Sequence, residues 1–260
     1  TFVRKGLVDH ADSMGAGARY GRGDTQWLTA GGGIQHAEMF PLLDPDGPNH
    51  LELFQIWLNL PAADKMVAPH FTMLWAEDQP TVVMDSDGRA EVTVIAGELR
   101  GVVPPPPPPA SYASRPDSDV AIWHIVMSPN ASFELPAARS AETLRVLYFF
   151  EGDELHVGPR TVPGSTGLAL AGDQAVRLAT RMSGVECLML QARPIGEPVA
   201  RQGPFVMNTR DEILQAYRDY QRTEFGGWPW PVPDPTHGPD PRRFAQHADG
   251  RIEEPEATSV

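Results

Sequence analysis

The fold is decided by the stretch from Gly23 to Glu38, whose sequence is Gly-Asp-Thr-Gln-Trp-Leu-Thr-Ala-Gly-Gly-Gly-Ile-Gln-His-Ala-Glu. A short apolar run is followed by three glycines, which permit a tight turn into a second strand. His36 and Glu38 lie two residues apart on that strand, so both side chains point to one face of a sheet. An imidazole and a carboxylate on one face can reach a single metal ion inside a barrel. By spacing alone, a surface or core histidine remains the commoner interpretation.

The rest of the chain supports an all-β fold. The 260 residues include 24 glycines and 27 prolines, which punctuate short runs rich in Val, Ile, Leu, Phe and Trp. The spaces between these runs are too short for the helices of parallel crossovers. We predict strands in the runs Leu51–Leu58, Glu91–Ala96, Val120–Val126 and Thr143–Phe150.

One helix is predicted near the C-terminus, from about Arg210 to Arg222. Thr209 and Glu212 have the spacing of a capping box, apolar residues fall on one face, and the glycine pair at Gly226 ends the segment. We expect this helix to pack on the outside of a barrel.

Six consecutive prolines, Pro104–Pro109, separate two sets of predicted strands. Proline lacks an N–H group and fixes φ, so this run is expected to form an exposed polyproline II linker or loop. Its alternative role as a ligand for a proline-binding domain is disfavoured, because nothing basic directly flanks it. We predict an N-terminal barrel at 1–103, a linker at 104–118, a C-terminal barrel with the helix at 119–230, and a wrapped or disordered tail at 231–260.

Composition and charge exclude several classes of function. The net charge of −13 opposes binding to phosphate backbones. The single cysteine, Cys187, excludes an intrachain disulfide, and its apolar surroundings predict a buried, inert thiol. No apolar stretch approaches the length of about 18 residues that a membrane span needs. We therefore expect a cytoplasmic monomer that binds neither membranes nor nucleic acid directly.

Several segments together resemble the pirin family, whose members are two-domain cupins. The stretch Gly23–Glu38 is similar to the pirin form of the second cupin motif, and the resemblance runs from Thr1 to about Trp230. The further matching segments are Gly6 with Asp9–Ser13, Phe54–Pro61, Pro194–Pro198, Gly203–Thr209 and Phe225–Trp230.

The resemblance implies two cupin barrels and one metal ion, usually iron, in the first of them. Pirins hold the ion with three histidines and a glutamate, from a His-x-His motif and a His-x-Glu motif. His36 and Glu38 are thereby implied as ligands of Fe(II) or another divalent first-row metal. Gly6 matches the glycine that closes the first motif, so two further histidines are expected upstream of Thr1, in a chain that we expect to be N-terminally incomplete. The second barrel is expected to be metal-free, because Val146–Gly152 carries apolar residues at the corresponding positions.

The resemblance also implies a function, a quercetin 2,3-dioxygenase-type oxidoreductase with a small aromatic substrate such as a flavonol. Glu38 would then serve as a ligand and as the base that takes the flavonol proton. The alternative is a non-catalytic regulatory protein, a transcription co-regulator or a protein that binds a metabolic enzyme, whose metal state tunes partner binding. His10 either faces the barrel interior near the metal or caps the following turn, and we favour the structural role.

Overall fold

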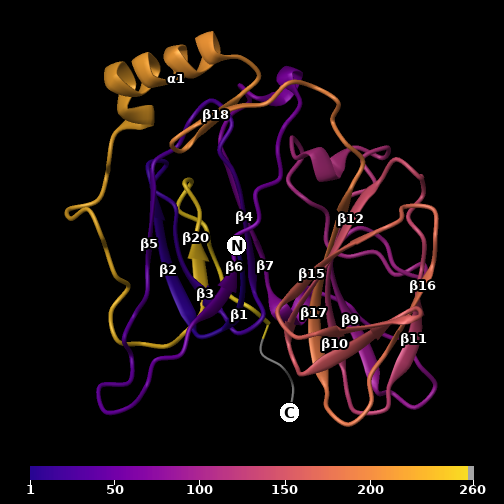
Figure 1. Ribbon diagram of the computed structural model, residues 1–260. Helices are drawn as coiled ribbons and strands as arrows, with labels where there is room; N and C mark the ends of the chain where they lie inside the picture. Colours follow the sequence, from indigo (N-terminus) through magenta and orange to yellow (C-terminus); the bar gives the residue numbers. More distant parts are fainter. Residues whose placement is uncertain (257–260) are drawn as a thin grey trace. The chain divides into compact units, whose positions relative to one another are not determined.

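The chain folds into antiparallel β-sheets and one α-helix, and the computed structural model describes residues 1–256 (Figure 1). The predicted all-β class with a C-terminal helix is confirmed. The chain divides into two units. Unit 1 comprises Thr1–Glu77, Pro108–Ser111 and the residues from Gly196 onward, and unit 2 comprises Asp78–Pro107 and Tyr112–Ile195.

The two larger antiparallel sheets of unit 1 share one interior. The four-stranded sheet has the spatial order β6 (Glu52–Phe54), β1 (Phe2–Lys5), β4 (Thr25–Thr29) and β7 (His70–Leu74). The five-stranded sheet has the order β21 (Ile252–Glu253), β20 (Phe244–Gln246), β3 (Gly17–Gly21), β2 (Leu7–Asp12) and β5 (His36–Met39). The ring of His10 on β2 stacks on Phe71 of β7, with 5.4 Å between ring centroids. The inner faces of the two sheets therefore meet in one cupin-type core.

The predicted glycine turn connects β4 to β5. Gly31 has φ +53 and Gly33 has φ +128, a region of backbone conformation that favours glycine. A Cβ atom at Gly31 would collide with the carbonyl oxygen of Val67, and one at Gly33 would collide with the ring of Phe225. Glycine is therefore required twice in the turn that delivers His36 to its strand.

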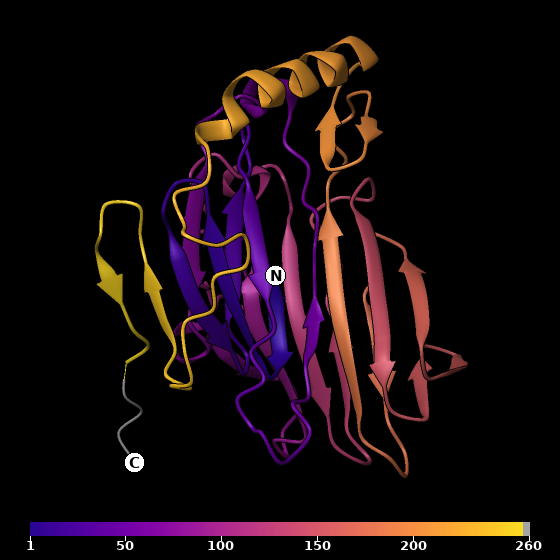
Figure 2. The same cartoon turned by 90° about the vertical axis from the view of Figure 1, so that its left-hand side faces the viewer.

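Helix α1 (Arg210–Thr223) begins at the predicted capping box. The Thr209 hydroxyl accepts a hydrogen bond from the Glu212 backbone N–H at 3.2 Å, and the Glu212 carboxylate accepts one from the Thr209 N–H at 2.7 Å. Ile213 is the buried residue of the helix. The helix packs on the hairpin of β18 (Ala200–Gln202) and β19 (Phe205–Met207), both drawn in orange in Figure 2. All three elements belong to unit 1.

The segment after Trp230 wraps around unit 1 and adds two strands to its larger sheet. Strand β20 pairs with β3, and Ala245 lies fully buried opposite Ala18. The indole N–H of Trp230 donates to the carbonyl of Asp12 at 2.8 Å. Pairing satisfies the backbone groups along β3 that would otherwise form an open sheet edge. The last four residues of the predicted tail lie outside the described part of the chain.

Unit 2 contains a six-stranded and a four-stranded antiparallel sheet. The larger has the order β15 (Thr166–Leu170), β12 (Leu144–Glu151), β17 (Val185–Ala192), β10 (Ala121–Met127), β9 (Ala90–Ala96) and β8 (Thr81–Val83). The smaller has the order β11 (Ser132–Leu135), β16 (Val176–Ala179), β13 (Glu154–Val157) and β14 (Arg160–Pro163). Between them lies an apolar core that includes Cys187.

The units divide at residues other than the proposed 1–103 and 119–230. The predicted strand Glu91–Ala96, part of β9, was expected in the first barrel, but β9 pairs with β10 and so lies in unit 2. Helix α1 was expected with the second barrel and lies in unit 1. The prolines 104–109 form no strand, as predicted, but the run is not exposed throughout, because only Pro106 and Pro109 are exposed and Pro108 is buried. Four 3₁₀ turns complete the description, at Ala62–Asp64, Ala76–Asp78, Tyr112–Ser114 and Glu224–Gly226. Within residues 1–256, no helix has the length and apolar character needed to cross a membrane.

Candidate functional site

Strands β2 and β5 place four side chains with metal-binding chemistry on one face of their sheet. In the antiparallel register His10 lies opposite Glu38, and Asp12 lies opposite His36. Residues two apart on a strand share a face, so all four residues lie on the same side. The stacking of His10 on Phe71 identifies that side as the interior of unit 1. The two residues predicted from the sequence therefore stand beside two further titratable residues.

Glu38 reaches across the interior to the facing sheet. One carboxylate oxygen accepts a hydrogen bond from the Thr1 hydroxyl at 3.2 Å, and the other accepts one from the Gln55 side-chain amide at 3.3 Å. Thr1 directly precedes β1 and Gln55 directly follows β6. These two donors hold the Glu38 carboxylate inside unit 1.

His36 begins β5, at the edge of its sheet, and is exposed. Its ring centroid lies 5.7 Å from that of His10. Desolvation by the surrounding protein lowers the pKa of His36, the His10 ring lowers it further, and Glu38 and Asp12 raise it. The net shift is downward, so His36 is neutral at neutral pH, which is the form that binds a metal ion.

His10 and Asp12 form a buried pair next to His36. The Nε2 atom of His10 lies 3.1 Å from the Asp12 carboxylate, and both side chains have no exposed surface. The other oxygen of Asp12 accepts the backbone N–H groups of Met14 and Ala16, at 2.9 and 3.1 Å. Asp12 therefore caps the turn that His10 was expected to cap, while the His10 ring faces the interior. The Nδ1 atom of His10 is buried and has no hydrogen-bond partner within residues 1–256.

Tyr20 and Gln26 add polar groups to the same interior that the sequence analysis missed. The Tyr20 hydroxyl donates to the Gln26 side-chain oxygen at 3.4 Å. Burial raises the pKa of Tyr20 well above its ordinary value, and the Glu38 carboxylate raises it further. The Gln26 amide nitrogen is buried without a partner in the described chain. A polar Gln26 directly before the apolar pair Trp27 and Leu28 was the one signal that pointed here.

The donor chemistry of this interior fits a divalent first-row metal, although the number of ligands is small. His36 offers a neutral imidazole and Glu38 a carboxylate, both suited to such ions. Across residues 1–256, no group of three or more His, Cys, Asp or Glu side chains is arranged to hold a metal ion. The unpartnered nitrogens of His10 and Gln26 leave polar capacity for a bound group beside His36 and Glu38.

Comparisons with known proteins agree with this architecture. Residues 1–58 match the family described as Pirin, and residues 122–226 match the Pirin C-terminal cupin domain. The chain is 32% identical over 228 residues to a putative quercetin 2,3-dioxygenase of Pseudomonas aeruginosa, covering 86% of this chain and 74% of that protein. It is 30% identical to human pirin, covering 86% and 73% of the two chains. A quercetin 2,3-dioxygenase structure from Acinetobacter baumannii is 28% identical and superposes with a TM-score of 0.73, covering 87% and 75% of the two chains. The chain belongs to the pirin family.

Proposed function

We propose that the chain is a metal-dependent oxygenase for a small aromatic substrate such as a flavonol. In this proposal His36 and Glu38 are ligands of one divalent metal ion, and Fe(II) is the first candidate for that ion. The observation that carries this proposal is the placement of both residues on the inner face of β5, opposite Asp12 and His10. The relative from P. aeruginosa, named as a putative quercetin 2,3-dioxygenase, and that from A. baumannii, named as a quercetin 2,3-dioxygenase, support the substrate class.

The residues of the chain have distinct roles in this proposal. When bound, the ion supplies Lewis-acid and one-electron chemistry. Glu38 accepts the hydroxyl proton of the flavonol, because its carboxylate is held inside unit 1 by Gln55 and the Thr1 hydroxyl. Tyr20 keeps its proton, since its pKa is raised, and donates it in a hydrogen bond that holds the Gln26 side chain beside Glu38. His10, oriented by Asp12, borders His36 and limits the orientations open to that ring.

Two protein ligands bind an ion more weakly than four, because each ligand lost is replaced by water. The two further histidines that the resemblance implies are matched by no residue of this chain. Metal content is therefore to be measured at defined concentrations of free metal, rather than in the protein as purified.

The metal assignment is tested by His36→Ala and Glu38→Gln, with His50→Ala as the control. His50 is exposed in the loop before β6. Elemental analysis after equilibration with Fe(II) or Ni(II) is expected to show bound metal in the parent chain and in the control, and at least a tenfold weaker affinity in the other two variants. Unchanged metal content in His36→Ala, with an unchanged circular dichroism spectrum, would show that other residues hold the ion.

The choice between enzyme and regulator is tested by following quercetin absorbance and oxygen uptake in the metal-loaded chain. We expect quercetin and oxygen to be consumed in a fixed ratio, and we expect Glu38→Gln to abolish this consumption. Metal binding without any turnover would remove the oxygenase and leave the regulatory alternative, in which the metal state of the same residues tunes a protein partner.

We further propose a cytoplasmic monomer without direct nucleic-acid binding. The net charge of −13 repels phosphate backbones, and the single buried cysteine suits a reducing compartment. We expect light scattering to give a molar mass in solution equal to that of one chain, 28.4 kDa.

A further inference from the structure

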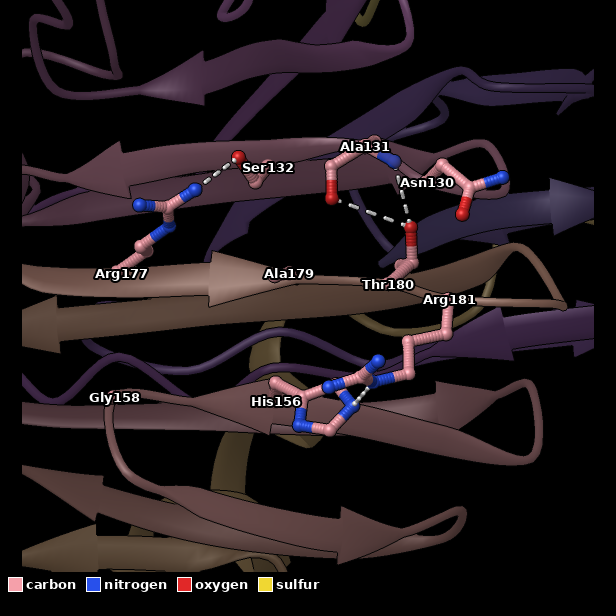
Figure 3. A pocket seen from close by; sticks show the side chains of 9 residues that line it. All are labelled: Asn130, Ala131, Ser132, His156, Gly158, Arg177, Ala179, Thr180 and Arg181. Atoms are coloured by element: carbon pink, nitrogen blue, oxygen red, sulfur yellow. Dashed lines mark hydrogen bonds between the residues drawn. The ribbon is translucent and has the colours of Figure 1, made fainter.

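The four-stranded sheet of unit 2 carries a hollow on its outer face. Phe133 and Leu178 are buried and face the core, while Ser132 and Ala179 alternate with them and lie on the opposite face. Ala179 is paired with Ser132 on one side and with His156 on the other, so these three residues form one row across the sheet. The small side chain of Ala179 leaves a hollow of about 420 Å³ over the middle of the row (Figure 3).

Two arginines stand at opposite ends of this hollow. A terminal nitrogen of Arg177 donates to the Ser132 hydroxyl at 2.9 Å, and the Nε–H of Arg181 donates to the His156 ring at 2.9 Å. Figure 3 shows Arg177 beside Ser132, Arg181 beside His156, and Ala179 between them. Ser132 and His156 lie on strands separated by β16, so the two guanidinium groups stand roughly two strand spacings apart, on the order of 10 Å.

Hydrogen bonds within unit 2 hold both ends of the hollow in place. Because Arg181 donates to Nε2 of His156, this nitrogen acts as an acceptor and the ring N–H is on Nδ1, which is 2.9 Å from the Thr161 hydroxyl. At the rim, the Thr180 hydroxyl donates to the carbonyl of Ser128 at 2.6 Å and accepts the N–H of Ala131 at 3.0 Å. These hydrogen bonds fix the His156 ring, and the ring in turn orients the Arg181 guanidinium.

The guanidinium groups keep unused capacity for anions. Among residues 1–256, neither Arg177 nor Arg181 forms an ion pair with a carboxylate. Two acidic residues lie on this face, Glu134, which is opposite Arg177 in the register, and Glu154, which lies 3.7 Å from Nε2 of His156. A guanidinium presents parallel N–H donors that match the two oxygens of a carboxylate or phosphate. Two guanidinium groups without ion pairs are unexpected in a chain whose net charge is −13.

We propose that this hollow binds a small linear molecule with an oxyanion group at each end, one held by Arg177 and the other by Arg181. The separation of the two guanidinium groups favours a two-ended ligand over a single anion, and the hollow has room for a short dicarboxylate or a sugar bisphosphate. Both sources share the same chemistry, paired oxyanions on a short linker. The proposal does not depend on the metal-dependent oxygenase activity.

Titration calorimetry at constant ionic strength tests the proposal with succinate, glutarate, adipate and fructose 1,6-bisphosphate, and with acetate as the single-anion probe. At least one dianion is expected to bind tenfold or more tightly than acetate, with a preferred length among the dicarboxylates. Arg177→Gln and Arg181→Gln are each expected to reduce that affinity about to the level of acetate. Both residues are exposed, so the variants are expected to keep the parent circular dichroism spectrum.

Arg218→Gln is the matched control, because it removes the same charge from an exposed position on helix α1 of the other unit. It is expected to change the affinity by less than twofold. Binding of the bisphosphate alone would support the site and assign phosphate as the anionic group, and binding of a dicarboxylate alone would assign carboxylate. The proposal is overturned if no dianion binds, if acetate binds as tightly as the dianions, or if Arg218→Gln weakens binding as much as the two hollow variants.

Discussion

Arg19 and Asp9 form a buried ion pair on the outer face of β2 and β3. The guanidinium donates to both carboxylate oxygens at 2.6 and 2.7 Å, and both side chains are almost wholly buried. Arg19 also donates to the carbonyls of Gly238 and Asp240, and Asp9 accepts the N–H of His237 at 2.9 Å. The pair therefore fixes the C-terminal segment on the sheet of the candidate site.

Removing one member of this pair is expected to destabilise the protein strongly. Arg19→Met or Asp9→Asn leaves the other member buried without its charged partner, which typically costs about 3–5 kcal/mol. Urea unfolding measures the change. The control is Arg251→Ala, which breaks an exposed pair with Glu253 and is expected to cost less than about 1 kcal/mol. An Arg19→Met loss no larger than that of the control would contradict this assignment.

Cys187 is expected to be unreactive in the folded chain. Burial raises the pKa of its thiol to about 12, with a smaller contribution from Glu186. At pH 9 an unperturbed thiol is about three quarters thiolate, whereas a pKa near 12 leaves about one part in a thousand. A disulfide reagent at pH 9 should therefore react with the denatured chain at once and with the native chain only slowly. Rapid labelling of native protein would show that β17 opens readily.

At the scale of single residues, local sequence patterns predicted some features of the site but not the contacts between distant parts of the chain. The inert thiol, the glycine turn and the shared face of His36 and Glu38 followed from local patterns. The partners did not, because Arg19 meets carbonyl groups more than 200 residues away in sequence. The basic hollow was missed for the same reason: Ser132, His156 and Arg181 are adjacent only through strand pairing.

At the scale of elements, strand β20 is the clearest addition to the predicted fold. Its residue Ala245 has no exposed surface and joins the core cluster of unit 1, although it lies in the segment predicted as a tail. Three residues of strand length, Phe244–Gln246, carry too little periodicity to be recognised in a polar, proline-rich sequence. The helix was predictable because its capping box and apolar face are both local, and it ends one residue later than expected, at Thr223.

Ala245→Asp is expected to detach this strand. A carboxylate at a fully buried position without a charged partner costs roughly 3–5 kcal/mol, by analogy with other unpaired buried charges. The matched control is Ala248→Asp, the same substitution at an exposed position three residues away, which should change stability by less than about 0.5 kcal/mol. Limited proteolysis should cut after residue 230 in the first variant only. Equal stability of the two variants would mean that β20 contributes nothing to unit 1.

At the scale of the whole molecule, the predicted division at the proline run and the observed one differ because the units are built from long-range pairing. Strands β8 and β9 precede the prolines in sequence, yet β9 pairs with β10 beyond them. Unit 1 likewise combines the first 77 residues with the last part of the chain. A proline-rich change in composition shows where a loop is, but it does not show which strands before and after that loop pair within one unit.

Each unit has its own core, and the two cores differ in a way that predicts their stabilities. Within residues 1–256 the core of unit 2 consists of 20 buried apolar residues, whereas that of unit 1 has nine. Since apolar burial contributes most of the folding free energy, unit 1 is expected to unfold at the lower temperature. Calorimetry should resolve two transitions. Ala245→Asp and added divalent metal should move only the lower one, in opposite directions, because a ligand that binds only the folded unit stabilises it.

Cys187 should become reactive only in the upper transition, since it lies in the core of unit 2. A single two-state transition, or exposure of Cys187 in the lower one, would show instead that the chain unfolds as one cooperative body.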